Sequence, residues 1–233
     1  MPEIIFEDNH LLVAVKPPNT LTQSDQTGDE SFQDELKRYV KEKYQKPGDV
    51  YLGLVHRMDR PVGGLIVFAR TSKAASRLSE QLRTHDMGRE YLAVVENGPS
   101  LSEQGELCDF LQKDEQSGDV RVVEAAAQGA QEARLFYQVL GRNENTALVH
   151  VTLQTGRKHQ IRVQLQHAGH PIVFDMRYGH GQRGQSIALW GALLRLSHPT
   201  QRQRMTFVSA PCGLAFEPYA TIIAAFLSGM QEE

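Results

Sequence analysis

The sequence predicts an α+β fold, with a mixed and mainly antiparallel sheet flanked by helices and loops. Short apolar runs rich in β-branched residues, such as 64–70 and 147–153, are typical of strands. The stretches 32–44 and 71–82 instead repeat apolar residues at helical spacing. Because the chain contains no internal repeat and no clear interdomain linker, we expect a single domain covering residues 1–233.

The first third of the chain predicts two strands, a helix and a third strand. Residues 3–18 contain two apolar runs separated by a turn at Asp8, which indicates two short strands. Ser31 is the expected N-cap of the helix that follows, because Asp34 comes three residues later. Residues 64–70 then form an apolar run with the length of a buried strand.

The middle of the chain predicts a helix, a strand and a polar surface region. Residues 71–82 are expected to be helical, with Ser72 as the cap. Residues 89–97 predict another strand. The acidic, glycine-spaced region 98–132 predicts hairpins and loops at the surface.

From residue 133 onward the pattern predicts four strands and one helix. Strands are expected at 133–140 and 147–153, where apolar residues alternate along the second run. A helix is expected at 159–168, followed by strands at 187–197 and 204–208 that are joined by a turn.

Composition predicts a globular, cytoplasmic protein whose chemistry needs neither a metal nor another cofactor. No apolar run reaches eighteen residues, and the amino terminus lacks a basic segment followed by an apolar one. A membrane span and a secretory signal are therefore not expected. Cys108 and Cys212 lie far apart, without the Cys and His spacing that a zinc site or a disulfide framework requires.

Charge is distributed unevenly along this chain of net charge −3. Residues 150–204 carry eight basic side chains and one acidic side chain, whereas residues 96–132 carry nine acidic and two basic ones. A local basic face can bind a phosphate backbone despite a negative total charge. We expect residues 150–204 to form a basic wall of a cleft, with the acidic stretch 96–132 lying away from it.

The segment HRMDRPVGG, residues 56–64, places a carboxylate between two arginines at the start of an expected strand. One interpretation is that Asp59, flanked by Arg57 and Arg60, forms a surface ion pair, which stabilises by about 0 to 1 kcal/mol. The other is a carboxylate kept ionised in a cleft, where it acts as a nucleophile or a base. The segment alone leaves both interpretations open.

Two further segments, REYLAVV at 89–95 and TGRKHQIRVQLQHAGHPIVFDMRYG at 155–179, follow HRMDRPVGG in the sequence. The three are similar to H-R-L-D-x-x-T-S-G, to K-x-Y-x-A-x-V, and to T-G-R-x-H-Q-I-R followed by G-H-P-I-x-G-D. These are motifs of the RluA-type pseudouridine synthases, which convert uridine in RNA to its carbon-linked isomer. Since IIFEDNHLLVAVKPP and LRLSHPTQ also fit, the resemblance covers nearly the whole chain.

The sequence departs from the family pattern at five positions, one of which is Arg89 in place of the lysine of the second motif. Met58 replaces Leu, which conserves volume. Val62 and Gly63 stand where the family has Thr and Ser, which concerns the hydrogen bonds of the loop more than the chemistry. Phe174 replaces the Gly that precedes Asp175. The accessory amino-terminal RNA-binding module of many relatives is expected to be absent.

The resemblance implies three catalytic residues. Asp59 is implied to be the essential group, which either attacks the sugar or abstracts a sugar proton, and both roles require the carboxylate. Arg162 is implied to pair with Asp59 and keep it charged. Tyr91 is implied to contact the target base, although a tyrosine packed in the core is the commoner role of such a strand residue.

The expected partner is a structured ribosomal or transfer RNA with its target uridine in a stem-loop, bound by a monomer. Arg57 is implied to enter the space that the target base leaves when it flips out of the stack, or to contact a phosphate. The other residues expected to bind RNA or brace the catalytic loop are Arg60, Arg157, Lys158, His159 and Gln160.

An alternative is a non-catalytic RNA-binding or RNA-chaperone protein that retains the same fold. Binding phosphates does not require Asp59, Tyr91 and Arg162 as a set, so their joint presence favours the enzyme. A phosphotransferase-like loop is disfavoured, because no glycine-rich phosphate cradle accompanies the aspartate.

Overall fold

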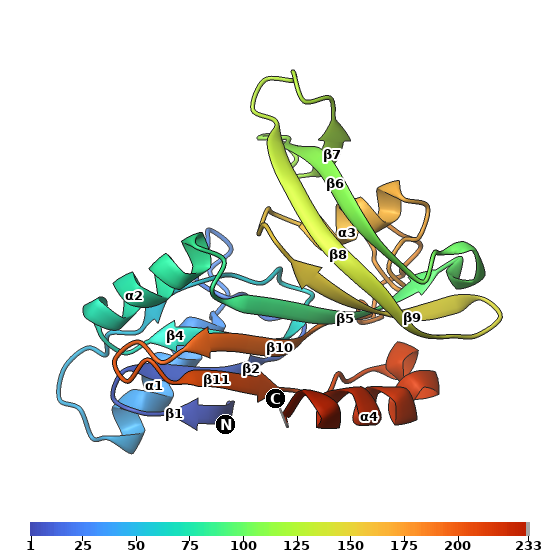
Figure 1. Cartoon of the computed structure of the whole chain (residues 1–233). Coiled ribbons are helices and arrows are strands. Elements are labelled where there is room, and N and C mark those ends of the chain that lie inside the picture. Colours follow the sequence, from blue (N-terminus) through green and yellow to red (C-terminus); the bar gives the residue numbers. More distant parts are fainter. Residues whose placement is uncertain (232–233) are drawn as a thin grey trace. The chain divides into compact units, whose positions relative to one another are not determined.

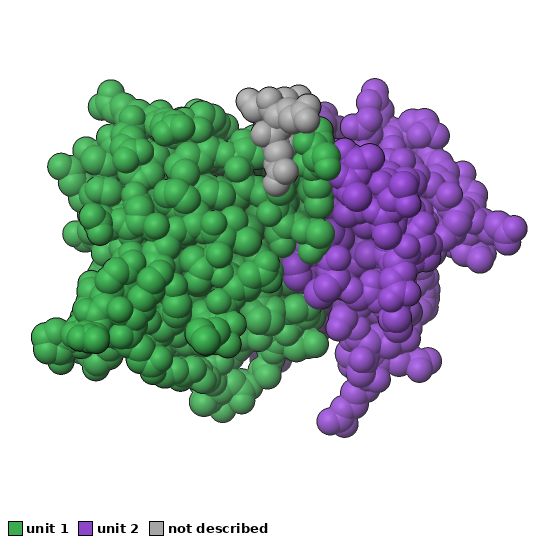
Figure 2. All heavy atoms as spheres, turned by 90° about the horizontal axis from the view of Figure 1, so that it is seen from below, with its two compact units in different colours: residues 1–89, 191–210, 227–233 green, residues 90–190, 211–226 purple. Residues whose placement is uncertain are grey.

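The computed structural model describes residues 1–231, which divide into two compact units (Figure 2). Unit 1 comprises residues 1–89, 191–210 and the described residues from 227 on, and unit 2 comprises residues 90–190 and 211–226. Each unit is described by itself below. The expectation that residues 1–233 act as one domain stays a prediction.

Unit 1 is built on antiparallel strand pairs (Figure 1). Its strands are β1 (Glu3–Glu7), β2 (Leu11–Lys16), β3 (Gly53–Leu54), β4 (Gly63–Ala69), β10 (Leu189–Ser197, from residue 191 on) and β11 (Arg204–Val208), and its helices are α1 (Phe32–Lys43) and α2 (Ser72–Arg83). The strand order is β1-β2-β4-β10-β11, and β3 pairs with β4.

The core of unit 1 follows from two fully apolar strands and the apolar face of α1. All residues of β2 and β4 are buried, as expected for strands covered on both faces. Phe32 and Leu36 of α1 are buried, and the Phe32 ring packs against Phe68 of β4. The helix begins as predicted, because Ser31 accepts a hydrogen bond from Asp34 N.

A glycine pair sets the close spacing at the start of β4. Gly64 has a φ of +123°, and a Cβ added there would lie 2.4 Å from the backbone of Gly191. Only glycine fits such an approach in that backbone conformation. The glycine-rich end of the HRMDRPVGG segment is therefore required by the sheet that follows it.

Unit 2 is a five-stranded antiparallel sheet in the order β5-β9-β8-β6-β7. Its elements are β5 (Gly88–Glu96, from residue 90 on), the 3₁₀ turn η1 (Gly98–Ser100), β6 (Gln104–Lys113), β7 (Val120–Val123), β8 (Gln131–Arg142), β9 (Thr146–Leu153), α3 (Gln160–His167), η2 (Leu214–Tyr219) and α4 (Ala220–Gln231, up to residue 226).

One face of the unit 2 sheet is covered by α3. Val163 of α3 packs with Ala133 of β8, together with Leu111 and Val120. Tyr137 lies four residues after Ala133 on the same strand and therefore on the same face. This apolar cluster fixes where the side chains of α3 lie relative to the sheet.

The predicted fold class is confirmed, one local prediction is corrected and one helix was missed. Thr71 rather than Ser72 caps α2, because the Thr71 hydroxyl accepts a hydrogen bond from Ala74 N. Helix α4 was not predicted. Its run ATIIAAFLSGMQ is almost uniformly apolar and so shows little helical periodicity.

None of the helices in residues 1–231 combines the length and the apolar character needed to cross a membrane.

Candidate active site

The loop that carries HRMDR connects β3 to β4 in unit 1. Asp59 is half-buried there, whereas Arg57 and Arg60 on either side are exposed. Arg60 forms an ion pair with Asp29 at 2.8 Å, and its Nε donates to Asn19 O. Arg60 is therefore bound by Asp29 and Asn19, and the role of Asp59 stays a prediction.

Hydrogen bonds fix the backbone of this loop on both sides of Asp59. Thr22 Oγ1 donates to Met58 O at 2.8 Å and accepts from Met58 N at 3.2 Å. Val62 N donates to Asp59 O at 3.1 Å. Because the Val62 contact comes from the backbone, this turn closes without the Thr and Ser side chains of the family motif.

Lys16 is a fully buried lysine next to this loop, and sequence analysis did not single it out. Its Nζ donates to Pro17 O, Thr20 O and Arg60 O at 2.9, 2.7 and 3.2 Å. Burial lowers the pKa of Lys16 to about 7, and the charge of Asp59 opposes that shift. The sequence signal is a lysine that ends an apolar strand directly before two prolines.

His56, the first residue of the HRMDR segment, is a buried neutral side chain. Val67 N of β4 donates to His56 Nε2 at 3.4 Å. Burial, followed by the charge of Arg89, lowers the pKa of His56 to about 3. At neutral pH this histidine therefore supports the loop as an uncharged residue.

Arg162 of α3 is buried and binds Asp175 through two hydrogen bonds. Its Nε donates to Asp175 Oδ2 at 2.7 Å and its Nη2 to Asp175 Oδ1 at 2.8 Å. Asp175 Oδ1 also accepts from the backbone N of Arg177 and Tyr178. Burial acts to raise the pKa of Asp175, but the hydrogen bonds and charge of Arg162 outweigh it and lower the pKa below its usual value.

Tyr178 and His159 extend this network around Arg162. The Arg162 guanidinium carbon lies 5.1 Å from the centre of the Tyr178 ring. Tyr178 Oη accepts from Val120 N at 3.0 Å and lies 2.7 Å from His159 Nδ1. His159 itself has a left-handed φ of 55° directly before α3. Sequence analysis gave Asp175 and Tyr178 no role, although both lie in the third family motif.

Gln160 fixes the loop that leads into α3. Its Oε1 accepts from Thr155 Oγ1 at 2.8 Å and from Arg157 N at 2.9 Å, and its Nε2 donates to Arg134 O. The Arg157 side chain donates to Glu132 O at 2.9 Å. These contacts tie the loop before α3 to β8, and the expected role of Gln160 in RNA binding or in bracing the catalytic loop stays a prediction.

The acidic stretch 96–132 contacts the basic segment, which corrects the expectation that it lies away from it. Lys158 Nζ donates to Gly118 O at 2.8 Å, and Arg177 Nε lies 3.3 Å from Asp119. The reason is that the turn between β6 and β7 reaches the loop before α3. A hollow of about 470 Å³ there is lined in part by Lys158 and Glu115.

Tyr91 of β5 is buried and shares a face of the unit 2 sheet with α3. It pairs with Val151, which also pairs with Tyr137. Directly opposed residues in antiparallel strands point to the same face. Tyr137 lies on the face that α3 covers, so Tyr91 and Arg162 belong to the same side of the sheet.

The predicted site residues are divided between the two units. Asp59, Arg57 and Arg60 belong to one loop of unit 1. Tyr91 and the residues from Arg157 to Arg162 belong to unit 2. The pairing of Asp59 with Arg162 stays a prediction.

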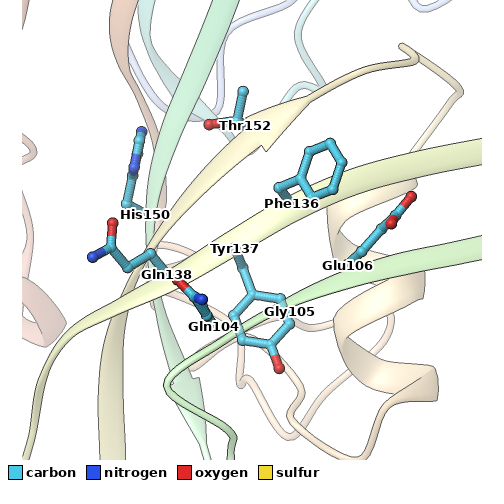
Figure 3. Close-up of a pocket in the computed structure, with 8 residues that line it drawn as sticks. All are labelled: Gln104, Gly105, Glu106, Phe136, Tyr137, Gln138, His150 and Thr152. Atoms are coloured by element: carbon cyan, nitrogen blue, oxygen red, sulfur yellow. The ribbon is translucent and has the colours of Figure 1, made fainter.

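A second hollow of about 470 Å³ lies on the opposite face of the unit 2 sheet and contains none of the predicted site residues (Figure 3). Phe136 is 41% exposed there. Phe136 pairs with Thr152, and Thr152 pairs with Glu90, so the three side chains share one face of the sheet. Glu90 directly precedes Tyr91 on β5, and adjacent strand residues point to opposite faces. The hollow therefore lies on the face opposite to Tyr91. The full lining is Gln104, Gly105, Glu106, Phe136, Tyr137, Gln138, His150 and Thr152.

Metal ligands are not grouped in the part of the chain that the structure describes. Within residues 1–231, no three His, Cys, Asp or Glu side chains come together so that they could hold a metal ion. Cys108 and Cys212 are exposed and not disulfide-bonded.

Comparison with known proteins identifies similar sequences over most of the chain. A sequence model of one family, described as RNA pseudouridylate synthase, matches residues 10–167. Ribosomal large subunit pseudouridine synthase C of Yersinia pestis is 34% identical over 234 residues, which is 94% of this chain and 70% of that protein. The protein of the same name from Salmonella typhi is 33% identical over 84% of this chain and 62% of its own length.

A third relative and two solved structures agree with these matches. Ribosomal large subunit pseudouridine synthase D of Zymomonas mobilis is 30% identical over 88% of this chain and 68% of its own length. Human RNA Pseudouridylate Synthase Domain Containing 4 superimposes with a TM-score of 0.72 at 23% identity, over 97% of this chain and 93% of its own. Human RNA Pseudouridylate Synthase Domain Containing 1 superimposes with a TM-score of 0.70 at 21% identity, over 91% of this chain and 84% of its own. The two structures show the shared fold.

Proposed function

Because the chain belongs to the RNA pseudouridylate synthase family, we propose that it isomerises specific uridines of ribosomal large-subunit RNA to pseudouridine in one catalytic domain. Family membership confirms the predicted enzyme class, a pseudouridine synthase of RNA. Three similar bacterial proteins have names that assign them to the large ribosomal subunit, which supports ribosomal over transfer RNA.

Asp59 is the residue at which the proposed reaction starts. Its carboxylate either attacks the sugar carbon that bears the base or abstracts a proton from the sugar, and both routes release the uracil from the ribose. The uracil then turns and its carbon 5 bonds to the same sugar carbon, as the Asp59–sugar bond breaks on the first route or the abstracted proton returns to the sugar on the second. Carbon 5 loses its proton and nitrogen 1, which left the sugar, gains one. Product and substrate are isomers, so the reaction consumes no co-reactant.

The observation that carries this proposal is the environment of Asp59. Its neighbours Met58 and Arg60 are held by hydrogen bonds from Thr22 and Lys16, so the loop is fixed before substrate binds. The buried Lys16 ammonium interacts electrostatically with Asp59. Both proposed roles require the carboxylate form of Asp59.

Arg162 is proposed to orient Asp59. Arg162 is buried at the start of α3, and its planar guanidinium binds a carboxylate at two points, as its contacts to Asp175 show. Asp175 and the Tyr178 ring hold this guanidinium in one orientation. A lysine has no planar fork that binds a carboxylate in this way.

Tyr91 and Arg57 are proposed to act on the target nucleotide. Tyr91 contacts the flipped uracil and assists the loss of the proton from carbon 5, a role supported by its position on the α3 face of the sheet. Arg57 is exposed and enters the space that the flipped base leaves in the RNA. Such an insertion offsets part of the few kcal/mol needed to unstack a base.

The proposal is tested with unmodified transcripts of large-subunit ribosomal RNA and of transfer RNA, incubated with the purified protein. Pseudouridines are then mapped chemically at nucleotide resolution. We expect modification of one or a few uridines in the ribosomal transcript. Modification of the transfer RNA alone would contradict the proposed target, and RNA binding without any pseudouridine would favour the non-catalytic alternative.

A further inference from the structure

Three exposed arginines of unit 1 surround a hollow of about 450 Å³ beside α2 and the β10–β11 turn. Arg77 comes from α2, and Arg202 and Arg204 come from the turn and the start of β11. Asp86 also lines the hollow. Three guanidinium groups against one carboxylate give this surface a positive charge, and none of these arginines belongs to the proposed active site.

The three guanidinium groups are not neutralised by carboxylates. Within residues 1–231, none of them lies at ion-pair distance from an Asp or Glu side chain. Arg77 Nη1 donates to Pro199 O at 2.5 Å, and Arg204 Nη1 donates to Asp86 O at 2.6 Å. The Asp86 carboxylate instead accepts from Thr84 Oγ1. Backbone carbonyls orient a guanidinium but leave its charge available for an anion.

Two other exposed arginines of unit 1 show the contrasting arrangement. Arg83, also on α2, is bound to the Glu80 carboxylate through two of its nitrogens. Arg38 of α1 is paired with Glu30. Neutral pairs of this kind bind phosphate poorly, so these two arginines provide a matched control.

The frame of the hollow is held in place by hydrogen bonds. Gln81 of α2 donates to Ser197 O and accepts from Ser197 N, both at 2.7 Å, which ties the helix to the end of β10. The buried His198 lies 2.8 Å from Asp8 through Nε2 and accepts from the turn backbone through Nδ1. Arg202 has a left-handed φ of 60°, which is unfavourable for a non-glycine residue. The backbone at Arg202 is fixed by the hydrogen bond from its N to His198 O at 2.9 Å.

The hollow and Asp59 lie at opposite ends of β4. The Asp59 loop precedes Gly63 at the start of this strand, whereas α2 follows Ala69 at its end. Seven residues of strand span about 20 Å. An RNA that reaches both places must therefore extend beyond the target nucleotide by several base pairs of A-form duplex.

We propose that Arg77, Arg202 and Arg204 bind the phosphodiester backbone of the RNA substrate outside its target stem-loop. Arginine matches phosphate oxygens through two parallel N–H donors, and the volume of the hollow suits a group of nucleotide size. The inference rests on the proposed function only for the identity of the partner as RNA. The three arginines would give the RNA a second contact with the protein, apart from the active site.

The test compares two RNAs, a minimal stem-loop and the same stem-loop with its stem extended by eight base pairs. For the parent protein we expect tighter binding of the extended RNA and a steeper dependence of log affinity on log salt. In R202Q/R204Q this gain should disappear, and the salt slope for the extended RNA should fall in magnitude by about 1.4 to 1.8. The control R38Q/R83Q makes the same change in net charge and should retain the gain.

Several results would overturn the inference. An unchanged gain in R202Q/R204Q would show that the arginines do not contact RNA, and an equal loss in R38Q/R83Q would show a general effect of charge. Inorganic phosphate is titrated as a separate probe. Binding of phosphate that depends on Arg202 and Arg204, without any effect on extended RNA, would assign the hollow to free anions. If the protein forms no pseudouridine but keeps the arginine-dependent gain, the proposed function fails and this inference stands.

Discussion

Removing the carboxylate that holds Arg162 should destabilise the protein strongly. Asp175 and Arg162 form a two-point ion pair whose side chains are 1% and 6% exposed. Asp175→Asn removes the carboxylate charge that contacts the buried Arg162 guanidinium at two points, and breaking a buried pair in this way costs about 3 to 5 kcal/mol. For a protein of this size, that corresponds to a fall in Tm of roughly 6 to 20 °C.

Thermal and urea unfolding, followed by circular dichroism, measure this effect. The matched control is Asp119→Asn, because Asp119 pairs with Arg177 at 3.3 Å while both side chains are about half exposed. Its loss should be below about 1 kcal/mol. Equal stabilities of the two variants would refute the conclusion that Asp175 neutralises a buried guanidinium. Replacing Asp175 and Arg162 together by uncharged residues should recover part of the loss.

Three further changes test other parts of the molecule. Arg162→Lys should lower the single-turnover rate of pseudouridine formation much more than RNA affinity, and a loss confined to affinity would make Arg162 a phosphate contact. Gly64→Ala should lower the free energy of unfolding, measured in urea, by more than about 4 kcal/mol, because its Cβ would collide with the Gly191 backbone. A decrease below about 1 kcal/mol would contradict this close approach. The pKa of His56 is about 3 in the folded state and near 6.5 in the unfolded state. As the pH falls below 6.5, the unfolded state therefore takes up the proton first and the free energy of unfolding decreases. The expected decrease is about 2 kcal/mol at pH 5. In His56→Asn that part of the pH dependence should vanish from urea titrations at pH 7 and pH 5.

Local sequence patterns predicted most of the secondary structure correctly because they reflect local physics. The strands β2 and β4 are recognisable from unbroken apolar runs, and α1 from its Ser31 cap. Helix α4 escaped because its residues lack a polar face to set a period. The cap of α2 could not be chosen between Thr71 and Ser72, because adjacent residues both have hydroxyl groups and only the backbone geometry decides.

The supporting residues of the candidate site could not be predicted because their contacts are long-range. Lys16 donates to the carbonyl of Arg60, forty-four positions away in the sequence. The contact of Lys158 with Gly118 depends on where the turn between β6 and β7 folds back. No pattern of local spacing contains that information, whereas the family motifs identified the residues proposed for the chemistry themselves.

The central claim is that the Asp59 carboxylate performs the chemistry, and single-turnover pseudouridine formation by Asp59→Asn tests it most directly. Asp29→Asn is the control, because it makes the same substitution at the exposed partner of Arg60 in the same unit. We predict no detectable product for Asp59→Asn at saturating protein, with RNA affinity and Tm close to those of the parent, and near-parental turnover for Asp29→Asn. A rate for Asp59→Asn within about tenfold of the parent, which is only about 1.4 kcal/mol of barrier, would contradict the account.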